Sequence, residues 1–339
     1  GARGMTADQV VRAAIVKQML GFTYKELAFH IIDSNSLRRF MRIGIADKGF
    51  KKSVLNKNVK ALSPQTWEAI NAQVVQYADD EKIEKGRQVR IDCTVVESNI
   101  HEPTDSSLLW DSVRVLTRLL HRAKQDFGLR LSFQDHTRRA KRRLVGIMNS
   151  RSKKDRKSKY ADLIKVTTKS ISYAQRAIEA IDNMASISSG MVALRLDLNR
   201  YSQLAGRVID QTQRRVMLGE DVPASEKVVS LFETHTDIIV KDRRDTFFGH
   251  KVCLTGGASN LIVDCLIVDG NPADSNLTIE MLDRQKELYG KYPLEVALDG
   301  GFASKDNLNK AKEKQIKDVC FAKKRGLEVE DMCRSQWVY

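Results

Sequence analysis

The stretch Arg87–Asn99, RQVRIDCTVVESN, is the part of the 339-residue chain that decides its fold. Its apolar positions are β-branched, which is typical of a β-strand: Val89, Ile91, Val95 and Val96. Gly86 precedes the stretch and Pro103 follows it, so residues that interrupt regular structure mark both limits. One acidic residue, Asp92, lies among the apolar positions. It is either a solvent-facing residue of a half-exposed strand or an acid positioned for chemistry.

The composition is that of an ordinary globular protein, with 42% hydrophobic and 29% charged residues. No apolar run approaches the ~20 residues of a membrane span, and no signal peptide precedes the first predicted helix. The cysteines show no metal-ligand spacing, and four of the five lie in apolar runs: Cys93, Cys253, Cys265 and Cys320. We therefore expect buried free thiols, no membrane partner and a reducing, cytoplasmic location.

Positive charge is concentrated in one segment. The chain has a net charge of +14, and residues 114–159 contribute +13 of it, from 16 Lys and Arg against three Asp and no Glu. Three arginines recur at every fourth position and so share a helix face: Arg114, Arg118 and Arg122. Five more cations are clustered in sequence: Arg138, Arg139, Lys141, Arg142 and Arg143. Solvated helix surfaces usually mix both signs of charge, so this segment favours a polyanionic partner, of which nucleic acid is the commonest.

Residues 1–62 are predicted to form a helical domain of the helix-turn-helix type. Two Thr residues with Gln or Glu three positions later have the spacing of capping boxes: Thr6–Gln9 and Thr23–Glu26. A third short helix is predicted near Ser36–Gly44. Such a bundle is equally consistent with DNA binding and with packing on a neighbouring domain. Residues 63–86 are predicted to form a helix, capped by Ser63, and a charged linker.

The remaining chain alternates between helical and strand-rich parts. Residues 87–101 are the first strand, and residues 102–245 are predicted to form a basic, all-helical insertion. From 246 to 339 the predicted order is strand, strand, helix, strand, helix, strand. This is an α/β order, that of an RNase H-like mixed-sheet core with a helical insertion after its first strand. In that topology the first strand lies beside the strand that ends in Asp299, so Asp92 and Asp299 are expected to meet.

Two carboxylates at one end of a sheet suit phosphodiester cleavage. The reaction uses two divalent ions about 4 Å apart, which stabilise the attacking and leaving oxygens. Mg²⁺ prefers oxygen ligands, with Mn²⁺ as the alternative ion, so Asp92 and Asp299 are the predicted catalytic and metal-binding residues. Gly300 and Gly301 leave room for ions and a DNA backbone. Lys251 is a candidate phosphate contact, although a strand-end surface residue is the commoner case.

The chain resembles bacterial insertion-sequence transposases of the DDE class over almost its whole length. The blocks that carry the resemblance are ADQVVRAAIVKQMLGFTYKELAFHIIDSNSLRRFMRIG at 7–44, RQVRIDCTVVESNIHEPTDSSLLWDSVRVLTRLL at 87–120, and FFGHKVCLTG, GNPADSNLTIEML and ALDGGFASKDNL at 247–256, 270–282 and 297–308. The resemblance implies that Asp92 and Asp299 are the first two acids of the DDE triad. It also implies a bacterial, cytoplasmic and nucleoid-associated protein. Its partners would be double-stranded DNA (terminal inverted repeats and target DNA) and further copies of itself on paired ends.

The third acid of that family is a Glu on a helix after the last core strand, and no such motif precedes Tyr339. Glu328 and Glu330 follow the last predicted strand, but their setting, RGLEVEDM, indicates a surface turn or short helix. We therefore expect the chain to stop short of this acid and to have little or no activity as given. Two alternatives to a transposase stay open: a catalytically inactive DNA-binding remnant, and an RNase H-like nuclease without strand transfer.

Overall fold

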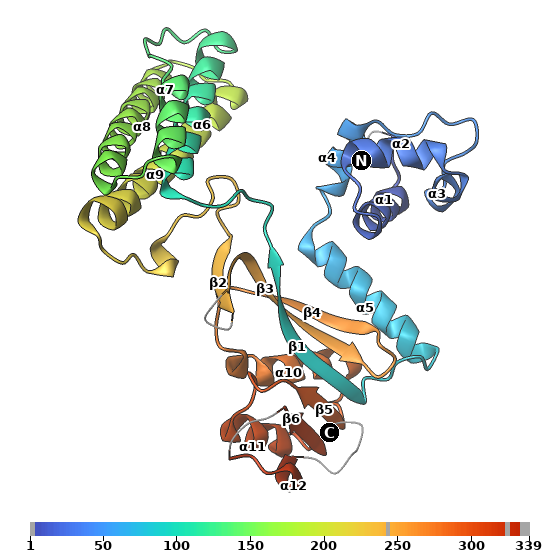
Figure 1. The fold of residues 1–339 in the computed structure, drawn as a ribbon. Coiled ribbons are helices and arrows are strands. Elements are labelled where there is room, and N and C mark those ends of the chain that lie inside the picture. Colours follow the sequence, from blue (N-terminus) through green and yellow to red (C-terminus); the bar gives the residue numbers. More distant parts are fainter. Residues whose placement is uncertain (1–3, 242–244, 323–325, 333–339) are drawn as a thin grey trace.

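The computed structural model describes residues 4–241, 245–322 and 326–332 and is drawn as a ribbon in Figure 1. These residues form a mixed α/β protein with twelve α-helices and one mixed sheet of six strands. The predicted α/β class is therefore confirmed. Residues 333–339, which include Cys333 and the stretch before Tyr339 searched for the third acid, lie outside the described residues.

Four short helices form the N-terminal lobe: α1 (Ala7–Met19), α2 (Tyr24–Asp33), α3 (Asn35–Phe40) and α4 (Lys52–Val59). The two predicted capping boxes are present, because Thr6 and Thr23 each accept a hydrogen bond from the backbone three residues later. Leu27 and Ile31 of α2 and Leu55 of α4 are fully buried at the centre of the lobe. The sequence does not predict α4, since this helix begins without a side-chain cap bond.

Helix α5 (Pro64–Asp80) leads from this lobe toward the sheet. As predicted, Ser63 caps it, by accepting a hydrogen bond from the backbone N–H of Thr66 at 3.3 Å. Asn71 Nδ2 donates to the backbone oxygen of Val263 at 2.7 Å, which fastens the helix to strand β4 (Ile262–Val268). One side of α5 is thus attached to the sheet.

The sheet has the strand order β2-β3-β1-β5-β6, and β4 pairs with β3. Its other strands are β1 (Gln88–Glu97), β2 (Asp237–Lys241), β3 (Asp245–Gly257), β5 (Glu295–Leu298) and β6 (Asp318–Phe321). β3 runs antiparallel to β1, β2 and β4, whereas β5 runs parallel to β1 and to β6. Strand β2 lies inside the range 102–245, for which the sequence predicts only helices. Its short apolar run, Ile238–Val240, lacks the alternation that marks longer strands.

One face of the sheet is covered by helices. Val89 and Ile91 of β1 are fully buried in a core shared with α10 (Thr278–Tyr289) and α11 (Lys305–Glu313). The short helix α12 (Val329–Met332) adds its last residue to this core. Arg90, Asp92 and Thr94 alternate with the buried positions of β1 and are exposed. Asp92 therefore points away from the core, as strand alternation requires.

The insertion after β1 is a helical lobe of α6 (Asp105–Gln125), α7 (Thr137–Met148), α8 (Lys153–Asp182) and α9 (Ser189–Thr212). Its apolar positions form two buried clusters, which contain most of the inward side chains of α6. The clustered cations of the sequence lie on α7, so they belong to a helix with one packed and one open face.

The lobes leave much surface open. The chain exposes 20913 Å², whereas a compact monomer of 38.4 kDa would expose about 14,000 Å². Figure 1 shows the reason: the N-terminal lobe and the helical insertion stand away from the sheet. Over the described residues, none of the helices combines the length and the apolar character needed to cross a membrane.

Candidate functional site

Asp92 lies in β1, and Asp299 is the residue that follows the last residue of β5. The parallel register between β1 and β5 runs from Gln88 opposite Glu295 to Ile91 opposite Leu298. Asp92 and Asp299 are thus the residues that come directly after the last registered pair of the two strands. Both acids are exposed, whereas Ile91 and Leu298, which precede them, are buried. The folded chain therefore brings two carboxylates, distant in sequence, to one edge of the sheet.

The turn after β5 is built around the side chain of Asp299. Its Oδ1 accepts a hydrogen bond from the backbone N–H of Gly301 at 2.5 Å. A Cβ atom at position 301 would lie 2.9 Å from this oxygen and 2.8 Å from Oδ2 of Asp274. Both distances are closer than real Cβ contacts, so a larger residue at position 301 would force one or both carboxylates to shift. The same geometry places the carboxylates of Asp274 and Asp299 close to one point beside this glycine.

Asp274 is the residue of this site that sequence reasoning missed. It begins a short 3₁₀ turn, Asp274–Asn276, before α10, and its position suggested only a helix cap. Instead its Oδ1 accepts a hydrogen bond from Nζ of Lys251 at 2.8 Å. A cap and an ion-pair partner look alike in sequence, and no local spacing distinguishes them.

Lys251, the candidate phosphate contact, lies in the interior of the site. It is 9% exposed, and its ammonium group also donates to the backbone oxygen of Pro272 at 2.6 Å. A buried ammonium group is costly unless it is paired, and Asp274 supplies that pair. This arrangement makes Lys251 less available to a DNA phosphate than the exposed cations of the insertion.

The donor set at the sheet edge consists of hard oxygen atoms. Asp92 and Asp299 are both exposed, so ions held there could keep several water ligands, as Mg²⁺ prefers. Over residues 4–241, 245–322 and 326–332, no three His, Cys, Asp or Glu side chains are arranged to hold a metal ion. The two carboxylates thus fit part of a magnesium site, and water or a further acid must supply the rest.

The first group of predicted DNA-binding arginines lies along one side of α6. Arg114, Arg118 and Arg122 are exposed on a helix whose other residues around them are largely buried. Arg114 is tied down, because its guanidinium group contacts Oδ1 of buried Asp111 at 2.6 Å and lies over the ring of Trp110. Arg122 lies 3.7 Å from the carboxylate of Asp126 and over the ring of Phe127, so Arg118 is the best placed of the three to reach a phosphate.

Asp111 also binds the histidine that follows the first strand. His101 Nε2 lies 2.7 Å from Oδ2 of Asp111. Burial acts to lower the pKa of His101, but the hydrogen bonds that its ring donates to Asp111 and to the backbone oxygen of Glu102, with the negative charge of Asp111, outweigh it and raise the pKa above its ordinary value. His101 thus attaches the chain that leaves β1 to α6, which is a structural role and accounts for its position near the site.

The second group of predicted DNA-binding residues is divided by the structure into two faces of α7. Arg139 and Arg143 both bind Asp162 of α8, and Nε of Arg143 lies 2.5 Å from its carboxylate. The pKa of Asp162 is lowered to about 2. The hydrogen bond that Arg139 donates is the largest cause, and the one that Arg143 donates adds to it. The other three cations of the group are exposed and share the opposite face: Arg138, Lys141 and Arg142.

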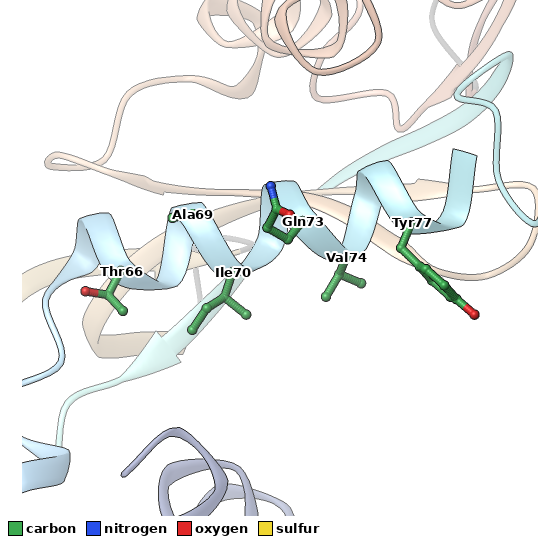
Figure 2. A pocket seen from close by; sticks show the side chains of 6 residues that line it. All are labelled: Thr66, Ala69, Ile70, Gln73, Val74 and Tyr77. Carbon is green, nitrogen blue, oxygen red and sulfur yellow. The ribbon is translucent and has the colours of Figure 1, made fainter. Parts of the chain in front are cut away.

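A different exposed surface lies on α5, and Figure 2 shows its side chains. Six residues of this one helix line an open apolar groove of about 470 Å³: Thr66, Ala69, Ile70, Gln73, Val74 and Tyr77. Val74 is 46% exposed and Tyr77 62% exposed. Val75 and Ala78 of the same helix are buried, so α5 is apolar on two sides, of which only one is covered. Exposed apolar patches of this kind often mark interaction surfaces.

Comparisons of the chain with protein-family models, with curated proteins and with solved structures find no match. The site is therefore interpreted from its own geometry and chemistry. It combines two exposed carboxylates at a sheet edge, a pair of buried Lys251 with half-buried Asp274, and a neighbouring lobe with exposed cations on α6 and α7.

Proposed function

We propose that this chain is a DNA transposase of the DDE class, which binds terminal inverted repeats, cleaves DNA strands with Mg²⁺ and joins the freed end to target DNA. The observation that carries the proposal is the parallel pairing of β1 with β5, whose last registered pair directly precedes Asp92 and Asp299, both of which are exposed. The order and directions of the strands support it. An antiparallel β4-β3-β1 unit followed by parallel β5 and β6 is the order expected of an RNase H-like core.

The chemistry assigns separate tasks to the residues of the site. Asp92 and Asp299 would hold the ions, which when bound polarise the phosphodiester and activate the attacking water or hydroxyl. The hydrogen bond from Gly301 fixes the orientation of the Asp299 carboxylate. The absence of a side chain at position 301 keeps the space beside Asp274 and Asp299 open. Lys251 neutralises Asp274, so the charge that remains at the sheet edge is that of Asp92 and Asp299.

A DNA-binding protein without catalytic activity is the second candidate function. It is favoured by one observation: the described residues place only two acids at the sheet edge, with Asp274 already paired to Lys251. Both functions require the basic insertion to hold DNA. An assay of strand cleavage distinguishes them, and an assay of joined products separates a transposase from a nuclease without strand transfer.

The exposed row on α7 provides the test of DNA binding. Replacing Arg138, Lys141 and Arg142 together with Gln is expected to weaken binding of double-stranded DNA and to flatten its salt dependence. Each lost phosphate contact reduces the slope of log K against log salt by about 0.9. Fluorescence anisotropy at several salt concentrations measures both quantities. We expect the slope to fall by an amount that corresponds to the loss of about two phosphate contacts, since not every exposed cation meets a phosphate.

The matched control removes three exposed lysines from the sheet side of the molecule, Lys291, Lys305 and Lys310. This variant has the same net charge as the α7 variant, so a general effect of charge would act on both. We expect its slope to stay close to that of the parent chain. Equal losses in the two variants would contradict a DNA site on α7.

Self-association through α5 is the proposed means by which two copies act on paired DNA ends. The groove residues are symmetric about the middle of the helix, so an antiparallel copy would set Ala69 against Val74 and Thr66 against Tyr77, a small side chain against a larger one each time.

Replacing Val74 with Asp is expected to dissociate such a dimer. A carboxylate in an apolar contact has no partner, and its burial should raise the dissociation constant at least about tenfold. Analytical ultracentrifugation over a range of concentrations measures the change. Ala72→Asp is the control, because it adds the same charge to an exposed position of α5 outside the groove. A parent chain that stays monomeric at the highest concentration would rule out this surface as a self-association site.

A further inference from the structure

A short loop of the N-terminal lobe presents an apolar side chain to solvent. Ile45 is 97% exposed, the highest value among the large apolar residues that the structure describes. It lies in the loop at 44–47, which follows α3. Met41 and Ile43, just before the loop, are buried in the core of the lobe. Single exposed apolar side chains are common, so what matters is how the loop around Ile45 is held.

A buried arginine fixes the backbone of this loop. Arg38 of α3 is 8% exposed. Its guanidinium group donates to the backbone oxygens of Gly44 at 3.2 Å, Ile45 at 2.7 Å and Asp47 at 2.6 Å. The loop also closes on itself, because the backbone N–H of Gly44 donates to Oδ2 of Asp47 at 2.8 Å. Three carbonyl groups bound by one planar cation leave the backbone little freedom. Ile45 is therefore held at a fixed place although its side chain is almost wholly exposed.

Both ends of the loop are attached to other helices of the lobe. Gln9 of α1 donates from Nε2 to the backbone oxygen of Arg42 at 3.1 Å. At the other end, a Cβ atom on Gly49 would lie 2.6 Å from Cγ1 of Ile32 in α2. Arg42 and Gly49 have positive φ angles of 52° and 68°, so the chain turns sharply on each side of the loop. The loop is thus a rigid projection of the lobe.

The segment around the loop is strongly basic. Residues 38–60 contain eight Lys and Arg against one acid, Asp47, which already accepts the hydrogen bond from Gly44. Exposed cations lie on both sides of Ile45 in the sequence: Arg39, Arg42, Lys48, Lys51 and Lys52. A protein partner would have to supply acids around a pocket for Ile45, whereas DNA carries phosphates along its whole length. Charge complementarity therefore favours nucleic acid as the partner of this loop.

We propose that the loop at 44–47 inserts Ile45 between stacked base pairs of double-stranded DNA from the minor groove, and so bends the DNA. Proteins that act in this way use an apolar side chain such as Ile and kink the duplex by about 20–90°. The minor groove is only about 6 Å wide. Neither neighbour of Ile45, Gly44 or Ala46, has a side chain beyond Cβ, so the tip of the loop is narrow. This role rests on the proposed function, since it takes double-stranded DNA as the partner.

The rigidity of the loop suits insertion. Separating two stacked base pairs costs free energy, and a mobile loop would add the cost of its own ordering on binding. Arg38 removes that second cost and is thus a positioning residue for Ile45. Pyrimidine–purine steps separate most easily, so the bend is expected at TA and CA steps. The exposed cations beside the loop would contact phosphates that flank the groove.

The test uses the full chain and a DNA duplex of about 20 base pairs with a central TA step and a dye at each end. Anisotropy measures binding, and energy transfer between the dyes measures bending. Binding of the parent chain should raise the transfer efficiency. Ile45→Ala should lose most of this rise and keep the salt dependence of binding, because no phosphate contact is removed. Ile45→Leu should still bend the DNA. Arg38→Lys keeps the charge without the planar fork and should lose part of the rise.

Met19→Ala is the matched control, because Met19 ends α1, is 77% exposed and lies outside the loop. Circular dichroism establishes that each variant is folded, and this control should bend DNA as the parent chain does. Binding without bending by the parent chain would overturn the role of Ile45, as would equal bending by the parent chain and Ile45→Ala. Ile45→Ala that bends DNA fully but loses self-association in the ultracentrifuge would make the loop a contact between copies instead. A parent chain that binds no double-stranded DNA would contradict the proposed function as well.

Discussion

Replacing Asp299 with Asn is expected to lower Mg²⁺-dependent DNA strand cleavage at least about 100-fold in any form of the protein that cleaves DNA. Changes in residues that only support metal ligands already cost about 10–100-fold. Loss of a ligand carboxylate should cost more. Asn keeps the size of Asp and retains an oxygen that can accept the hydrogen bond from Gly301, so the turn after β5 should persist. The variant therefore removes charge with little change of shape.

The same substitution at Asp92 should have an effect of similar size, because the two acids directly follow the last registered pair of β1 and β5. Asp306→Asn is the control, since Asp306 is an exposed acid on α11 that pairs with Lys310. Mn²⁺ binding followed by electron paramagnetic resonance reports on the ion directly. It applies to the chain as given, whether or not that chain cleaves DNA. Full cleavage by either site variant would refute the catalytic assignment.

Replacing Phe302 with Ala is expected to destabilise the sheet core by about 3–5 kcal/mol, the usual cost of removing a fully buried aromatic side chain. Phe302 is 0% exposed and lies three residues after Asp299. Its backbone oxygen accepts hydrogen bonds from Thr278 Oγ1 at 3.1 Å and from Asn307 Nδ2 at 2.9 Å. The residue thus anchors the turn that carries Asp299 to α10 and α11. Urea unfolding followed by circular dichroism measures the loss.

Phe29→Ala is the control for this prediction, because Phe29 of α2 is 60% exposed and its removal leaves no cavity. Surface substitutions of this kind usually change stability by less than about 0.5 kcal/mol. A second effect of Phe302→Ala should be weaker Mn²⁺ binding, because the cavity left by the ring loosens the packing beneath the Asp299 turn even though the backbone oxygen of residue 302 keeps its hydrogen bonds. A loss below about 1 kcal/mol would mean that the core around Phe302 can close over the missing ring.

Structural features formed by residues close together in the sequence can be predicted from residue types alone. The capping boxes at Thr6 and Thr23 join residues three positions apart, so their residue types predict them directly. The Ser63–Pro64 start of α5 is equally local. The predicted order of strands makes the first strand and the strand before Asp299 parallel neighbours, as β1 and β5 are. Asp92 and Asp299 directly follow the last registered pair of these strands. In contrast, Cys265 is exposed although it lies in an apolar run, because its side of β4 is open.

The α/β class and the helix starts at Thr6, Thr23 and Ser63 could thus be predicted from residue types and spacing alone. Which charged residues are free depends on how the chain folds. Arg139 and Arg143 bind Asp162, whereas Arg138, Lys141 and Arg142 stay exposed. The pairing of Lys251 with Asp274, the exposure of Ile45, and the open side of α5 are decided in the same way. The physical reason is range: a cap needs only its own helix, but an ion pair or a covered face needs a partner that folding brings from far along the chain.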